Sequence, residues 1–212
     1  MRCGFPLSCI PVFDKRACGG DRAISEMNID TFWQIIGEVH QASGGDMDRK
    51  CELLKMRLEA LEDDGELLDF SRHFETMDAA GYTWPLWGAV YVMNGGCSDD
   101  SFSDFRGTLI SQGREVFERA IKDADSLAEV DYGGEDVCYE GFQHVAQEIL
   151  RERGLEAPRD VPFPADPAGE EWNEDEAELA ALYPKLAARY AEGGGRDDSG
   201  PAGSGKPWWK VW

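Results

Sequence analysis

The chain of 212 residues carries 42 acidic and 21 basic side chains, which gives a net charge of −21 at pH 7. This charge excludes nucleic acids and anionic membrane surfaces as favoured partners, because both are negatively charged and would be repelled. The sequence has no apolar run of about 20 residues that could cross a bilayer and no recognisable secretory signal. We therefore expect a cytoplasmic protein whose six cysteines stay reduced.

The first part of the chain differs from the remainder. Residues 1–26 show no helical or strand period and hold three of the six cysteines, so we expect a disordered segment outside the fold. A first helix is expected from a cap at Asp30 to a stop at Gly44. Two more apolar stripes at helical spacing come next, from Met47 to Leu61 and from Leu67 to Met77.

Capping and stop residues mark the helices in the middle of the chain. Thr83 is expected to cap a helix that stops at the sequence NGG, residues 94–96. The acidic stretch SDDSFSDF should open the next helix, and REVFERAIKDAD should form a short one after it. A further apolar stripe predicts a helix from about Cys138 to Gly154.

The composition changes after Gly154. The proline-rich stretch LEAPRDVPFPADPAGEEW predicts an extended surface segment, and NEDEAELAALYPKLAARY predicts helix that is interrupted at Pro184. No stretch alternates between apolar and polar residues as a strand would, so we expect an all-α fold with one globular multi-helix domain over 27–191. By composition, 192–206 is a flexible linker to a tryptophan-rich peptide at 207–212.

The densest polar and aromatic stretch, LWGAVYVMNGGCSDDSFSDFRGTLISQGR, holds the first candidate site. Its polar side chains allow three interpretations. The arginines could pair with the aspartates across a tight helix–helix corner, which is a structural role. The aspartates could instead line a pocket for a small ligand or a divalent ion, or the cysteine before the helix N-terminus could act as a nucleophile. The residues concerned are Asn94, Cys97, Asp99, Asp100, Asp104, Arg106 and Arg114.

Other chemistry finds little support in the sequence. The three histidines fall in separate helices without metal-ligand spacing, and no Cys-x-x-Cys pair occurs. Glycine-rich phosphate loops and the Gly-x-Ser-x-Gly motif are also absent from the sequence. We therefore assign no catalytic residue, metal ligand or cofactor, and we expect a protein that is not an enzyme.

The same stretch resembles a known family. The run from Asn94 to Asp100 with Phe102, Phe105 and Arg106, together with FWQIIGEVH upstream and GEEWNEDE downstream, resembles the bacterial family called domain of unknown function 4240. The resemblance extends from about Met27 to about Tyr190. It implies a helical fold, and it implies no activity.

The C-terminal sequence KPWWKVW points to a function of its own. The linker before it has an r.m.s. reach of roughly 20 Å, so the peptide could visit a partner's active site. A recognition domain, a spacer and a short aromatic core resemble a ribosomally made precursor, in particular the scaffold peptides from which alkaloids are built at a C-terminal tryptophan. Such a resemblance implies peptide-modifying partners, namely a tRNA-dependent ligase, an oxidase and a protease. The residues to be modified would be Trp208, Trp209, Lys210 and Trp212.

Two functions therefore compete at this point. The first is a non-enzymatic carrier whose folded domain presents KPWWKVW to modifying enzymes. The alternative is a small-ligand-binding or enzymatic domain with its site between Asn94 and Arg114.

Overall fold

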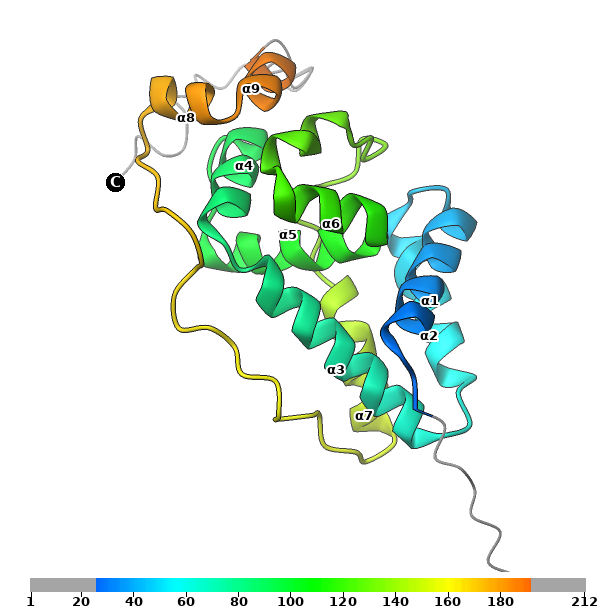
Figure 1. Cartoon of the computed structure of the whole chain (residues 1–212). Coiled ribbons are helices and arrows are strands. Elements are labelled where there is room, and N and C mark those ends of the chain that lie inside the picture. Colours follow the sequence, from blue (N-terminus) through cyan, green and yellow to red (C-terminus); the bar gives the residue numbers. More distant parts are fainter. Residues whose placement is uncertain (1–25, 192–212) are drawn as a thin grey trace, which may run out of the picture.

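A computed structural model describes residues 26–191 of the protein (Figure 1). Over this range the fold is all-α, as predicted, and the described residues form no β-strand. The predicted N-terminal segment, apart from Glu26, and the predicted linker and tryptophan-rich peptide lie outside the described residues. None of the helices in the described part is both long and apolar enough to span a bilayer.

The helices follow one another with short connections up to α6. Their bounds are α1 Ile29–Ser43, α2 Met47–Glu59, α3 Asp64–Gly81, α4 Trp84–Asn94, α5 Asp99–Ser111, α6 Arg114–Lys122, α7 Val145–Glu152, α8 Glu176–Leu182 and α9 Pro184–Ala191, with short 3₁₀ helices η1 Ala124–Glu129 and η2 Phe142–His144.

Most of the predicted helix ends are confirmed. The Thr83 side chain accepts a hydrogen bond from the amide of Leu86, and Gly95 ends α4 in the left-handed conformation with φ 68°. Gly44 ends α1 in the same way. The predicted cap at Asp30 is wrong, because Asn28 accepts the amide of Thr31 and Asp30 lies in the first turn.

The helix predicted from Cys138 begins later than expected. Gly133, Gly134 and Gly141 all have positive φ angles, so the chain forms a looped segment there before η2 and α7. Phe142 and Ile149 are buried as the apolar stripe implies, but Cys138 belongs to the loop. Glycine conformation therefore decides this boundary, which the apolar period alone did not reveal.

The helix α5 forms the centre of the core. Phe102, Phe105, Leu109 and Ile110 have no exposed surface. Around this helix, α1 and α2 pack as a pair on one side, α3 runs across the molecule, and α4 leads towards α8 and α9 at the opposite end (Figure 1). Burial of these side chains stabilises the fold by about 1.5–3 kcal/mol each.

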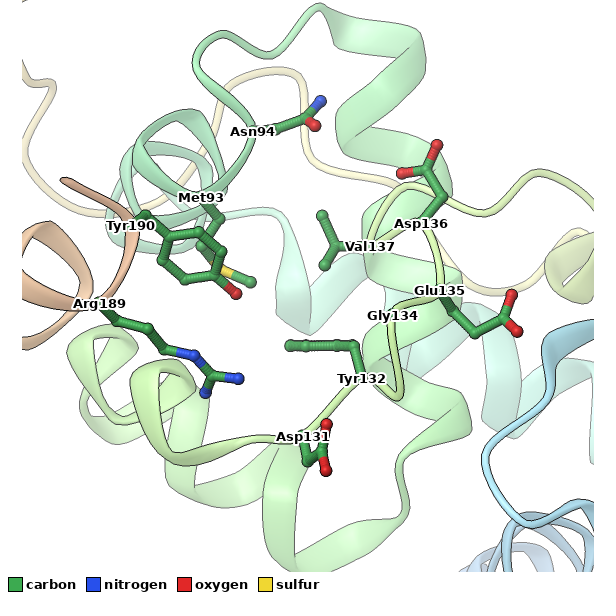
Figure 2. A pocket seen from close by; sticks show the side chains of 10 residues that line it. All are labelled: Met93, Asn94, Asp131, Tyr132, Gly134, Glu135, Asp136, Val137, Arg189 and Tyr190. Atoms are coloured by element: carbon green, nitrogen blue, oxygen red, sulfur yellow. The ribbon is translucent and has the colours of Figure 1, made fainter. Parts of the chain in front are cut away.

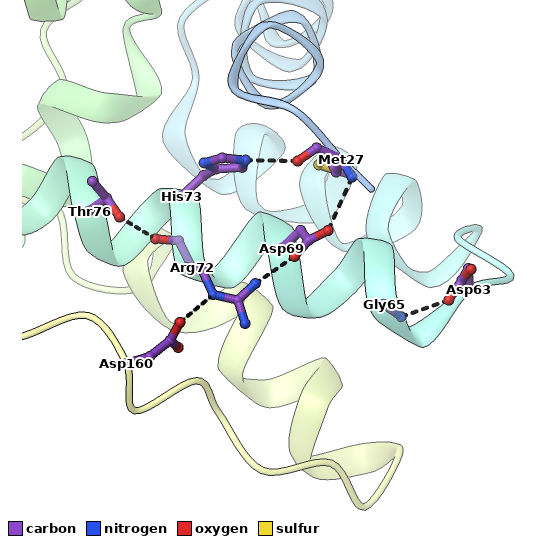
Figure 3. Close-up of polar contacts among 8 residues, drawn as sticks. All are labelled: Met27, Asp63, Gly65, Asp69, Arg72, His73, Thr76 and Asp160. Atoms are coloured by element: carbon purple, nitrogen blue, oxygen red, sulfur yellow. Dashed lines mark hydrogen bonds and ion pairs between the residues drawn. The ribbon is translucent and has the colours of Figure 1, made fainter. Parts of the chain in front are cut away.

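Helix α3 fixes the start of the described chain and the extended segment (Figure 3). The amide of Met27 donates to Asp69 at 3.1 Å, and Nε2 of His73 donates to the Met27 carbonyl oxygen at 2.8 Å. Arg72 pairs with Asp69 at 2.5 Å and with Asp160 at 2.9 Å. Side chains of α3 thus hold both Met27, near the start of the described chain, and Asp160 of the extended segment.

The predicted extended segment between α7 and α8 passes along the outside of α3 (Figure 1). Backbone hydrogen bonds attach it to the start of α4, from Trp84 to Ala168 at 2.8 Å and from Ala168 to Tyr82 at 3.0 Å. The indole of Trp172 donates to the Trp84 carbonyl oxygen at 3.0 Å. This segment carries the chain to α8 and α9, which complete one end of the molecule.

Candidate functional site

The charged residues of the predicted corner do not pair with one another. Arg106 donates from Nε to Asp78 of α3 at 2.8 Å, so its predicted pairing with the α5 aspartates is wrong. The reason lies in the packing of α3 on α5. Gly81 leaves room for the arginine stem, since a Cβ added there would lie 3.3 Å from Cδ of Arg106.

Aromatic rings complete the surroundings of Arg106. Its guanidinium carbon lies 5.1 Å from the ring centre of Tyr82, 4.9 Å from that of Phe102 and 5.4 Å from that of Phe163. The arginine is 5% exposed. A buried cation with a carboxylate and stacked rings is satisfied within the protein, so Arg106 has a structural role.

The other charged residues of the corner turn to separate partners. Arg114 pairs with Asp30 at 2.7 Å and with Glu118 at 2.6 Å, and thereby joins α6 to α1. Asp104 accepts a hydrogen bond from Gln143 at 2.6 Å. Asp99 and Asp100 lie exposed in the first turn of α5. Within residues 26–191, no group of three or more His, Cys, Asp or Glu side chains is arranged to hold a metal ion.

Cys97 meets a second cysteine that lies far from it in the sequence. The thiol of Cys138 interacts with that of Cys97, and this hydrogen bond together with burial raises the pKa of Cys138 far above its usual range. The Asn94 amide lies 3.9 Å from the Cys138 sulfur. Cys97 itself donates to the Ser98 carbonyl oxygen at 3.5 Å, so both thiols have partners within the described part of the protein.

Asn94 is also one of the residues that line a cavity of about 500 Å³ between the end of α4, the loop 131–137 and α9 (Figure 2). Met93 and Val137 contribute apolar surface to it, whereas Tyr132, Arg189 and Tyr190 bring polar groups. The cavity is therefore built from three parts of the chain that are distant in sequence.

The loop 131–137 owes its shape to short-range hydrogen bonds and glycines. Asp131 accepts the amide of Gly133 and Asp136 accepts the amide of Cys138, each at 2.9 Å. Gly133 and Gly134 have φ angles of 65° and 84°, where residues other than glycine are strained. These turns place Tyr132 on the inner side of the loop (Figure 2).

Helix α9 is held against η1, and this positions Arg189. The carboxylate of Asp125 accepts the amides of Lys185 and Leu186, so it caps the N-terminus of α9. Nη1 of Arg189 donates to the carbonyl oxygens of Ala128 at 2.6 Å and Val130 at 2.7 Å.

Tyr132 is the least satisfied polar residue of the cavity. It is 7% exposed, and its buried hydroxyl has no hydrogen-bond partner among the described residues. Burial raises the pKa of Tyr132 well above its usual range, and the charge of Arg189 opposes this rise. The phenol therefore stays neutral and can donate a hydrogen bond at physiological pH.

Most of the described chain matches a known family model. Residues 27–152 match the family model described as "Protein of unknown function (DUF4240)". The chain belongs to the DUF4240 family. The match starts at Met27, as the resemblance predicted, but it ends with α7 and does not reach Tyr190. No curated protein and no solved structure matches the chain.

The DUF4240 match covers α4 and the loop 131–137, but not α9. Two walls of the cavity thus lie within the matched residues, and the third comes from the part of the chain beyond the match. Sequence reasoning selected Asn94 and missed Tyr132 and Arg189. The glycines after Tyr132 are a turn signal, but they do not say which way the tyrosine points.

A second unusual group of this family member lies in its core. Lys50 is fully buried, and its ammonium donates to the Ser111 hydroxyl at 3.1 Å. Burial lowers the pKa of Lys50 to about 8. His40 lies close by with its Nδ1 atom buried and unpartnered among the described residues, and burial followed by the charge of Lys50 lowers its pKa. The sequence signal was Lys50 itself, which stands on an apolar helix stripe between Met47 and Leu54.

Proposed function

We propose that this DUF4240 protein binds a small organic ligand in the cavity between α4, the loop 131–137 and α9. The observation that carries this proposal is the buried hydroxyl of Tyr132, which has no hydrogen-bond partner among the described residues and belongs to a side chain that lines the cavity. A buried hydroxyl without a partner costs about 1–3 kcal/mol, which a bound acceptor would recover. The volume of about 500 Å³ is suited to a small molecule.

The composition of the cavity favours binding over catalysis. Among the described lining residues none is a histidine, cysteine, serine or lysine, and the carboxylates that could serve as bases, those of Asp131, Glu135 and Asp136, all belong to the single loop 131–137. Asparagine, tyrosine and arginine side chains orient ligands by hydrogen bonding. We therefore propose a binding role and no reaction.

A fragment screen by protein-observed NMR tests the ligand-binding proposal. We expect hits that shift the amide signals of the loop 131–137 and of α9. A Val137→Trp variant fills the cavity and should lose these hits. Tyr183→Phe serves as the control, since the Tyr183 hydroxyl donates to the Pro85 carbonyl oxygen and Tyr183 does not line this cavity. A screen without hits at these signals contradicts the proposal.

The second candidate function concerns the chain beyond α9. We propose that the folded domain also acts as a handle that presents KPWWKVW to a tRNA-dependent ligase, an oxidase and a protease. The residues proposed for modification, Trp208, Trp209, Lys210 and Trp212, lie outside the described residues. The feature that favours this proposal lies in the sequence, where the glycine- and serine-rich stretch 192–206 separates the helical domain from a peptide with three tryptophans in its last five residues.

Mass spectrometry of the C-terminal peptide tests the carrier proposal. The full chain is coexpressed with the genes that neighbour its own, and we expect a mass change within 207–212. As a control, the same 192–212 segment is fused to an unrelated soluble protein, where processing should fail for lack of the docking domain. An unmodified terminal peptide from the full chain contradicts the proposal.

A further inference from the structure

We infer that the ligand of this cavity is a small monocarboxylate with an apolar body, and that Arg189 binds its carboxylate group. The inference rests on the ligand-binding function proposed above and names the chemical class of the ligand.

The Arg189 guanidinium is held in a fixed position. Its Nη1 atom donates to the carbonyl oxygens of Ala128 and Val130, which uses both hydrogens of that nitrogen. These bonds satisfy carbonyl oxygens at the C-terminal end of η1, which have no partner within that helix. They leave the edge formed by Nε and Nη2 without a hydrogen-bond partner among the described residues. This edge offers two parallel N–H groups, the arrangement that matches the two oxygens of a carboxylate.

Three polar side chains of the cavity point towards the same space. Figure 2 shows that Tyr132, Arg189 and Tyr190 point towards a common region of the cavity. The guanidinium carbon of Arg189 lies 5.6 Å from the ring centre of Tyr190, and the charge of Arg189 opposes the rise in pKa that burial causes in both tyrosines. A carboxylate has about four lone-pair sites, so it can accept from the guanidinium edge and from both hydroxyls.

The charges around the cavity limit the negative charge that a ligand can carry. The carboxylates of Asp131, Glu135 and Asp136 belong to the loop that forms one wall, whereas Arg189 is the only basic residue among the described lining. The whole chain has a net charge of −21. A second negative charge on the ligand would have no cation of its own and would meet this repulsion. A ligand with a single carboxylate is therefore preferred over a dicarboxylate or a phosphate.

One part of the cavity is apolar. Met93 and Val137 present side chains that cannot hydrogen-bond to a ligand, and both lie beside the region towards which the donors point (Figure 2). An aromatic or branched aliphatic body would remove this surface from water. The ligand class is therefore a carboxylic acid with one apolar group of moderate size.

Isothermal titration calorimetry on the full chain tests this inference with three matched probes. Hydrocinnamate carries one carboxylate, hydrocinnamamide is its neutral counterpart, and benzylmalonate adds a second carboxylate to the same body. We expect hydrocinnamate to bind at least about tenfold more tightly than either of the others, because a charge-assisted bidentate contact is lost in the amide and repulsion is added in the malonate.

Variants connect the preference to named residues. Arg189→Gln should reduce the affinity for hydrocinnamate to that for the amide, and Tyr132→Phe should weaken hydrocinnamate binding several-fold. Arg189→Lys keeps the charge without the planar edge and should lose most of the preference, so it serves if Arg189→Gln does not fold. Arg159→Gln, at an exposed arginine of the extended segment, is the matched control and should change nothing.

The outcomes separate the two proposals. Equal binding of hydrocinnamate and its amide, or tighter binding of benzylmalonate, overturns the inference and leaves ligand binding in place. If none of the three probes binds while the NMR screen finds another ligand at the loop 131–137, the inference is again wrong and the binding function stands. If neither experiment detects binding at the cavity, both proposals fail.

Discussion

Two arginines of this protein illustrate opposite ways of satisfying the same side chain. Arg106 is buried, pairs with Asp78 and lies among the rings of Tyr82, Phe102 and Phe163. Arg189 is exposed, donates only to backbone carbonyl oxygens and has no carboxylate partner among the described residues. An arginine whose partners are complete holds the fold together, whereas one with an open edge is available to a ligand.

Removal of Arg106 should have the largest effect. Arg106→Ala leaves the partly buried Asp78 without its cation and opens a space among the rings, so we expect a loss of about 3–5 kcal/mol in the free energy of unfolding. Arg189→Ala should cost about 1–3 kcal/mol, because it removes two hydrogen bonds that each contribute about 0.5–1.5 kcal/mol. Urea denaturation of both variants checks this. Equal losses would show that both arginines are structural.

Lys50 is a third cation, buried without any carboxylate bonded to it among the described residues, and it should make stability depend on pH. Its pKa is about 8 in the folded protein against 10.5 ordinarily, so the unfolded chain binds more protons between these values. The free energy of unfolding attributable to Lys50 should therefore rise as pH increases through this window, by up to about 3 kcal/mol.

Lys50→Met should be more stable than the wild type near pH 7. Its free energy of unfolding should also lack the increase with pH that Lys50 causes. The difference between variant and wild type is the quantity to follow, because buried tyrosines with raised pKa values, such as Tyr132, lower the stability of both proteins at the alkaline end. Denaturation curves from pH 7 to pH 10 provide the measurement. A constant difference across that range would mean that Lys50 is charged in the fold throughout.

The hydroxyls of Tyr132 and Tyr183 offer a smaller but sharper contrast. The Tyr183 hydroxyl donates to Pro85 at 2.9 Å, whereas that of Tyr132 has no partner in the described part of the chain. Tyr183→Phe should lose about 1 kcal/mol, and Tyr132→Phe should be neutral or gain a similar amount. Thermal unfolding without added ligand compares them. A loss in both variants would mean that Tyr132 is satisfied within the protein.

Deletion of residues 1–26 should have the smallest effect. The contacts of Met27 with Asp69 and His73 belong to the described domain and remain in the shortened chain. We expect the melting temperature to change by no more than a few degrees, and differential scanning calorimetry of the two proteins measures it. A large drop would show that the deleted segment packs on the helices.

Local sequence was enough to predict the helices and most of their ends. The apolar stripes of α1, α2 and α3 follow the 3.6-residue period, and Thr83, Gly95 and Ser98 act within a few residues of where they stand. These features depend on neighbours along the chain, so they can be read in chain order. Two ends were exceptions: α1 is capped by Asn28 in place of Asp30, and α7 starts late because glycines with positive φ angles overrode the apolar period.

The tertiary structure alone decided which polar groups meet. Arg106 and Asp78 are 28 residues apart, and Lys50 and Ser111 are 61 apart, so their contacts depend on how α3 and the pair of α1 and α2 pack around α5. Sequence proximity suggested that Arg106 would bind the aspartates of its own helix, but a long side chain pairs with whichever carboxylate the packed neighbour presents. The same reason applies to Tyr132 and Arg189. Their convergence arises only when the loop 131–137 and α9 close on the end of α4.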